Sequence, residues 1–93
     1  MIEIIAKTDD GKYQLEKDWN QNGRPDKFWI CLSGLIIEHF NNEDQSEVLQ
    51  KFKDFLKPEG YEQKTREEPR ENGNFDVFNI ADENGCLIFS MRR

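Results

Sequence analysis

FWICLSGLIIEHF, residues 28–40, is the stretch of sequence that decides the fold. It holds nine apolar side chains in thirteen residues, within a chain in which 34% of the residues are charged. The pair Ser33-Gly34 interrupts the apolar run, and a short glycine-containing pair between two such runs is typical of a tight hairpin turn. We therefore expect two strands, 27–32 and 35–40. A single long strand bent at Gly34 is the alternative.

The segments before this stretch also predict strands. IEIIAK, residues 2–7, is rich in β-branched side chains, and the Asp-Gly pair at 10–11 is favoured in tight hairpins. KYQLEKDW, residues 12–19, then alternates apolar and polar side chains, as a half-buried strand does. NQNGRPD, residues 20–26, has the composition of a loop.

One segment, residues 43–57, predicts a helix. Its apolar residues recur at a spacing of three and four, which forms one stripe along a helix: Val48, Leu49, Phe52, Phe55 and Leu56. We expect Asn42 to cap its N-terminus, and Pro58 with Gly60 to end it.

The C-terminal third predicts three further strands. YEQKTR, residues 61–66, is expected to form a short edge strand, and EEPRENGN, residues 67–74, a charged loop. FDVFNIA and CLIFSM, residues 75–81 and 86–91, are expected to pair as a hairpin around the turn DENG. The sequence thus predicts one α+β domain over residues 1–93: a curled, mostly antiparallel sheet of about five to seven strands in the order β-β-β-β-α-β-β-β, with a single amphipathic helix, about 43–57, packed on one face.

Several predicted strands carry apolar side chains on both faces, and one helix covers only one face. Trp29 and Cys31 point away from their apolar neighbours, and so do Phe78 and Ile80. Three covers are open for the second face: curling of the sheet together with the loop at 20–27, a second copy of the chain, or another protein. Trp19 and Trp29 are both expected mainly in the core, and Trp29 is the better interface candidate.

No group of residues predicts catalysis or a metal site. His39 is the only histidine and follows Glu38 directly, so in a strand the two side chains point to opposite faces. Cys31 and Cys86 lie in apolar runs and are expected to be reduced core residues. DENG, residues 82–85, lacks the glutamate that a calcium loop needs, which favours a turn. We expect no catalytic residue, no metal and no cofactor.

The formal net charge of −6 disfavours nucleic acid and favours a basic partner. We expect a non-catalytic protein-binding domain, of the inhibitor or immunity-protein type, that binds a larger or basic protein or a second copy. The residues expected to contact the partner are Trp29, Cys31, Phe78, Ile80, Arg66 and Arg70. Two alternatives remain: a homodimeric enzyme or small-ligand-binding domain with its site at the subunit cleft, and a single-stranded nucleic-acid binder. The sequence shows no leader and no membrane-spanning run, so we expect no membrane association and a cytoplasmic location.

Overall fold

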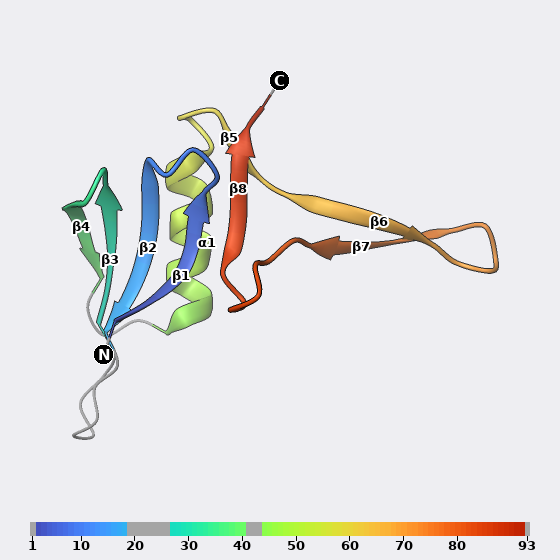
Figure 1. Ribbon diagram of the computed structural model, residues 1–93, viewed down its shortest axis with the longest axis horizontal. Coiled ribbons are helices and arrows are strands. Elements are labelled where there is room, and N and C mark those ends of the chain that lie inside the picture. The colour runs from blue at the N-terminus through green and yellow to red at the C-terminus, as the bar shows by residue number, and fades with distance from the viewer. Residues whose placement is uncertain (1, 19–26, 41–43, 93) are drawn as a thin grey trace.

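Six strands form one sheet, and a separate two-stranded hairpin extends from it (Figure 1). The computed structural model describes residues 2–18, 27–40 and 44–92. Eight strands and one helix follow in the order β-β-β-β-α-β-β-β-β: β1 (Ile2–Thr8), β2 (Tyr13–Asp18), β3 (Lys27–Leu32), β4 (Leu35–Phe40), α1 (Gln45–Leu56), β5 (Tyr61–Gln63), β6 (Thr65–Pro69), β7 (Phe75–Asn79) and β8 (Leu87–Met91). The predicted α+β class is confirmed, with one strand more after the helix than the sequence predicts.

The six-stranded sheet has the order β4-β3-β2-β1-β8-β5 and is antiparallel except between β1 and β8. Its first four strands pair in chain order and antiparallel, and the two hairpins that the sequence predicts, β1–β2 and β3–β4, are among these pairs. The turn at Ser33-Gly34 has positive φ at both residues, 49° and 87°. This is the geometry of the two-residue turn that matches the twist of antiparallel strands. The strands on either side of it, 27–32 and 35–40, have the predicted bounds.

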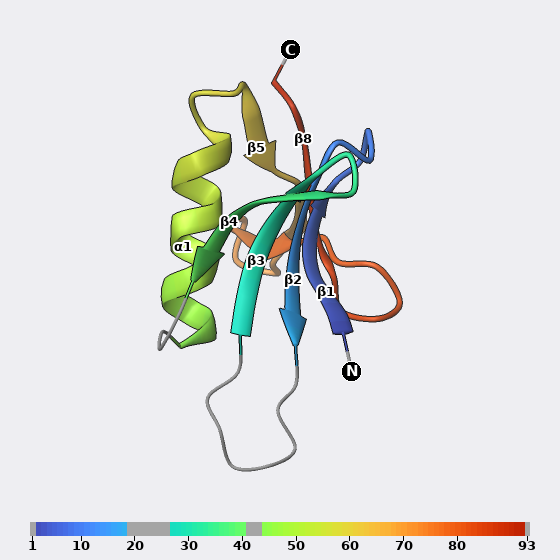
Figure 2. The ribbon, with the colours of Figure 1, turned by 90° about the vertical axis from the view of Figure 1, so that its left-hand side faces the viewer.

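Helix α1 covers one face of this sheet (Figure 2). Its buried residues Val48, Phe52 and Leu56 belong to the predicted apolar stripe. The observed N-cap is Asp44, whose side chain accepts a 2.9 Å hydrogen bond from the backbone N–H of Glu47. The predicted cap Asn42 lies outside the described residues.

The core lies between the helix and the sheet. Side chains from five strands meet the helix there, and the largest completely buried ones are Phe52, Phe89, Leu15, Ile30 and Leu56. The rings of Phe52 and Phe89 pack edge to face, with their centroids 5.4 Å apart. This contact fixes β8 against the helix, although 37 residues of sequence separate the two rings.

The predicted C-terminal hairpin is the main correction. β7 pairs with β6, which begins in the predicted edge strand 61–66 and continues through residues 67–69 of the predicted charged loop. β8 joins the main sheet between β1 and β5. Only a single bridge, Ala81 to Leu87, remains of the predicted pairing. The turn at 82–85 does form, because the backbone N–H of Gly85 donates to the Asp82 carbonyl at 3.0 Å. Pairing with β1 and β5 buries Phe89, which explains why β8 takes that position.

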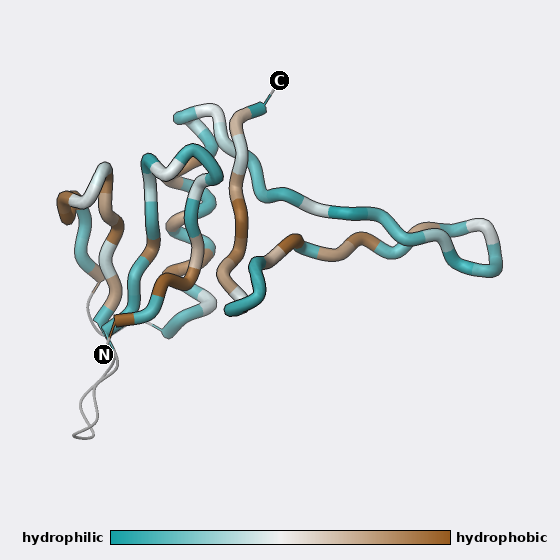
Figure 3. The backbone as a smooth tube through the Cα atoms, viewed as in Figure 1, coloured by the Kyte–Doolittle hydropathy of each residue, from teal (hydrophilic) through white to brown (hydrophobic). Residues whose placement is uncertain are grey.

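The molecule measures 48 × 30 × 21 Å, and the β6–β7 hairpin forms one end of the long axis (Figure 1). Apolar residues lie along β7, while β6 is mostly polar (Figure 3). The fold therefore places the apolar side chains of β7 away from the core between the helix and the sheet.

Candidate protein-binding surface

The β6–β7 hairpin is a two-stranded ribbon whose two faces have different chemistry. Its ladder runs from Thr65 opposite Asn79 to Pro69 opposite Phe75. Because side chains alternate along a strand, every second pair of this ladder lies on the same face. The hairpin therefore has one face around Val77 and another around Arg66.

The first face, here called the Val77 face, consists of Thr65, Glu67, Pro69, Phe75, Val77 and Asn79. Glu67 lies opposite Val77, and Pro69 lies opposite Phe75. Phe75 and Val77 expose 61% and 62% of their surfaces, among the highest values for large apolar residues in the described part of the chain. Apolar side chains that lie next to each other on an exposed surface often mark an interaction site.

The second face, the Arg66 face, is held together by charged pairs. The guanidinium carbon of Arg66 lies 5.5 Å from the centre of the Phe78 ring, and its Nη2 lies 3.3 Å from Glu68 Oε1. Nε of Arg70 donates a 2.5 Å hydrogen bond to Asp76 Oδ1. Both arginines thus contact other residues of the hairpin, and these contacts help to hold β6 and β7 together.

The structure brings four of the six predicted contact residues together in the hairpin region. Arg66, Arg70 and Phe78 lie on the Arg66 face, and Phe78 remains 41% exposed. Ile80 lies at the base, half-buried, where its backbone N–H donates to the carbonyl of Lys64 at 2.9 Å.

Sequence reasoning did not assign Phe75 and Val77 to the binding surface. The signal that could have found them is the alternation of FDVFN, which has large apolar residues on both sides. The segment opposite them, TREEP, has few residues that favour strands, and this concealed β6.

The other two predicted residues, Trp29 and Cys31, lie on the sheet face opposite the helix, around Glu16. The indole Nε1 of Trp29 donates a 2.6 Å hydrogen bond to Glu16 Oε2, and the Cys31 thiol lies 3.5 Å from the same oxygen. Gln14 Nε2 donates to Glu16 Oε1 at 3.1 Å. Cys31 is 5% exposed and Trp29 is half-buried. Burial, and then the Glu16 carboxylate, raise the pKa of the Cys31 thiol, which disfavours the reactive thiolate. Trp19 lies outside the described residues.

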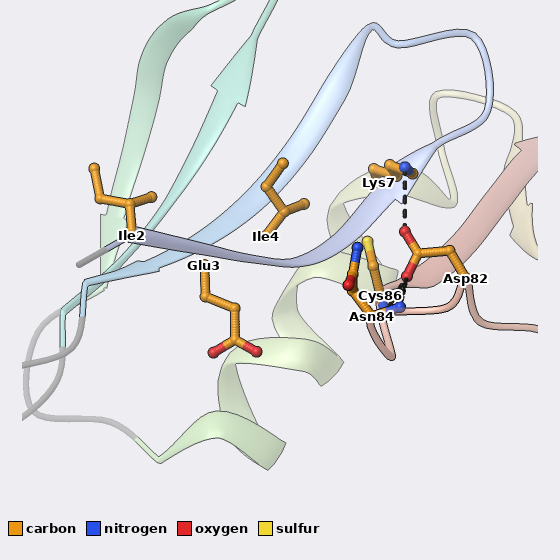
Figure 4. Close-up of a pocket in the computed structure, with 7 residues that line it drawn as sticks. All are labelled: Ile2, Glu3, Ile4, Lys7, Asp82, Asn84 and Cys86. Carbon is orange, nitrogen blue, oxygen red and sulfur yellow. Dashed lines mark hydrogen bonds and ion pairs between the residues drawn. The ribbon is translucent and has the colours of Figure 1, made fainter.

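An open groove of about 530 Å³ runs along the N-terminal half of β1 (Figure 4). Ile2 and Ile4 line one side, while Lys7 and Asp82 form an ion pair of 3.4 Å at its end. The Asp82 carboxylate also accepts hydrogen bonds from two backbone N–H groups of its own turn, chiefly that of Cys86, and these lower its pKa. Asp82 is therefore engaged in building the turn.

Among the described residues, no three His, Cys, Asp or Glu side chains are grouped as a metal ion would require. No helix in those residues is long and apolar enough to cross a membrane. When the chain is compared with known protein families, with curated proteins and with solved structures, it matches none of them.

Proposed function

We propose that this chain is a non-catalytic protein-binding domain that holds a basic partner protein with the Val77 face of the β6–β7 hairpin. The observation that carries this proposal is the exposure of Phe75 and Val77, at 61% and 62%, on a ribbon that projects from the body of the molecule (Figure 3). Phenylalanine is among the residues enriched in protein interfaces, and Val77 extends the apolar surface beside Phe75.

The low expected stability of a two-stranded hairpin on its own supports the proposal that a partner covers it. An isolated two-stranded hairpin is marginally stable in water, because it has no second layer on which to bury a face. Covering about 200 Å² of apolar surface would contribute about 5 kcal/mol before the costs of association. A partner on the Val77 face would therefore stabilise the hairpin as well as bind it.

Charge favours a basic partner. The chain carries a formal net charge of −6. Glu67 lies on the Val77 face and Glu71 lies next to the hairpin tip, and neither has an ion-pair partner among the residues that the structure describes. Lysines or arginines around an apolar pocket on the partner would complement both features. Such complementarity acts mainly on the association rate, which should fall as salt is added.

The shape of the molecule favours an antagonist, such as an inhibitor or an immunity protein. A narrow ribbon on a small body can enter a cleft of a larger protein, where it would block access to that cleft. Single-stranded nucleic acid is less favoured as the partner, because Arg66 and Arg70 each pair with a carboxylate in the hairpin.

Affinity capture from a lysate of the native host, with three versions of the chain as bait, tests the proposal. The wild-type chain should retain one stoichiometric basic protein at low salt. Val77→Lys should weaken retention at least tenfold, because it places a charge in the apolar contact. Ile2→Lys is the matched control, since Ile2 is 61% exposed and begins β1, which belongs to the six-stranded sheet and not to the hairpin.

Two results would contradict the proposal. One is that no stoichiometric protein is retained at low or moderate salt. The other is that Val77→Lys and Ile2→Lys retain the same protein equally well, which would place the contact outside the hairpin.

A further inference from the structure

Strand β4 forms one edge of the six-stranded sheet, and no described strand pairs with its outer side. Of its residues, Leu35, Ile36 and Ile37 expose 72%, 49% and 43% of their surfaces. Natural proteins usually protect such an edge with lysine, proline or a covering segment, because its free backbone groups can pair with another strand. The three apolar residues offer no such protection.

The register of β3 and β4 shows which backbone groups point outward. Leu32 and Leu35 flank the two-residue turn, so they exchange both hydrogen bonds with each other. The next residue, Ile36, therefore directs its backbone N–H and C=O away from β3. Ile37 is an extra residue in β4 that has no partner in β3, and it shifts by one the alternation of inward and outward backbone groups. The next residue whose N–H and C=O point outward is therefore His39.

The same register assigns the side chains to faces. Ile36 lies opposite Cys31 and His39 lies opposite Trp29, so both belong to the open face of the sheet. Leu35 and Phe40, at the two ends of β4, lie on the face covered by the helix. β4 is therefore symmetric about its middle. From either end, the first residue lies on the helix side, and the second lies on the open face with its backbone N–H and C=O pointing outward.

We propose that β4 pairs with β4 of a second copy of this chain, antiparallel about a two-fold axis between Ile37 and Glu38. Ile36 of each copy would exchange both backbone hydrogen bonds with His39 of the other, and Leu35 would pack against Phe40 on the helix side. The two sheets would join into one sheet of twelve strands, six from each copy. The occupant is a second copy because the edge is self-complementary in register and in face, as two-fold interfaces require.

Dimerisation through β4 should depend on salt concentration in the opposite way to partner binding by the hairpin. Each copy carries a formal charge of −6, so two copies repel each other at long range. Added salt screens this repulsion, and dimerisation should become stronger. Binding of a basic partner by the hairpin should weaken under the same conditions, so the two surfaces can be distinguished.

Sedimentation equilibrium of the purified chain, from about 1 μM to about 1 mM protein, covers the affinities expected of a small edge-to-edge interface. The wild-type mass should rise from monomer to dimer, and the rise should move to lower concentration as salt is added. His39→Pro removes one outward N–H without removing a bond of the β3–β4 ladder, and Ile36→Lys puts a charge at the edge. Each variant should raise the dissociation constant at least tenfold, while Ile2→Lys and Val77→Lys should leave it unchanged.

Amide hydrogen exchange provides a second readout that does not depend on whether the proline variant folds. The amides of Ile36 and His39 should exchange several-fold more slowly in concentrated than in dilute wild-type protein. A monomer at every concentration would overturn the proposal. A dimer that forms equally well in Ile36→Lys would also overturn it, because another surface would then hold the copies together.

Discussion

The guanidinium of Arg66 lies over the ring of Phe78, 5.5 Å from its centre, directly across the β6–β7 ladder. This contact and the Arg70–Asp76 pair lie on one face of the hairpin and leave the other face, with Phe75 and Val77, without a cover. The hairpin therefore has one face that maintains its shape and one that is available for a partner.

Phe78→Ala should remove the ring current that acts on Arg66. In the wild-type chain, the δ protons of Arg66 should resonate upfield of their usual position, and this shift should disappear in the variant. The free energy of unfolding should change by less than about 1 kcal/mol, because the contact is exposed. Arg66 chemical shifts and urea unfolding measure both effects. An unchanged Arg66 spectrum would show that the two side chains do not stack in solution.

Glu16→Gln should loosen the open face of the sheet. The carboxylate accepts hydrogen bonds at both oxygens, from Trp29 at 2.6 Å and from Gln14 at 3.1 Å. A glutamine amide has no charge and keeps only one acceptor oxygen, so the free energy of unfolding should fall by about 1–3 kcal/mol. The pKa of Cys31 should fall toward its usual value, since Glu16 adds to the effect of burial. Burial would still hold the pKa above that value.

Thiol modification with a disulfide reagent tests the second part of this prediction. In a Cys86→Ser background, Cys31 should react faster after Glu16→Gln. In a Cys31→Ser background, the rate at Cys86 should not change. Equal acceleration at both cysteines would indicate general loosening of the fold instead.

Asp10 and Tyr61 should make stability depend on pH. The Tyr61 hydroxyl donates a 2.5 Å hydrogen bond to Asp10 Oδ2, which holds the pKa of Asp10 below its usual value of 3.8 and raises the pKa of Tyr61 to about 12. The Asp10 contribution should thus be present above about pH 4 and be lost as the pH falls. The Tyr61 contribution should be present below pH 10 and be lost between pH 10 and about 12.

Urea unfolding between pH 7 and pH 3 measures how much stability is lost as Asp10 becomes protonated. Asp10→Asn should lower stability at pH 7 and flatten the dependence in the acid range. Tyr61→Phe removes the same bond from the other side, so the double variant should lose less stability than the sum of the two single losses. Additive losses would mean that the two groups do not interact.

The sequence was sufficient for the parts of the fold that local patterns determine. Alternation and turn chemistry predicted the hairpin on either side of Ser33-Gly34, and apolar spacing predicted helix α1. The cap differed by two residues, because Asp44 and Asn42 are equally suited to that role. In these segments the apolar residues recur at a regular spacing, and that spacing alone distinguishes a strand from a helix.

The pairing of strands that are distant in sequence could not be predicted from local patterns. The sequence predicted strands at 75–81 and 86–91, but it could not show that β8 would pair with β1 and β5. Residues 67–69 of β6 were predicted as loop because glutamate and proline are depleted in strands, and pairing with β7 holds this segment extended. For the same reason, the sequence predicted excess apolar surface but could not locate it at Phe75 and Val77.

Site-specific photo-crosslinking in the native host shows directly whether the β6–β7 hairpin contacts a protein partner. A benzophenone amino acid replaces Val77 in one version of the chain and Ile2 in another, two sites of nearly equal exposure. If the hairpin holds a protein partner, irradiation should give one dominant adduct with a basic protein from position 77, and much less of it from position 2. The same adduct in equal yield from both positions, or no adduct from position 77, would contradict the account.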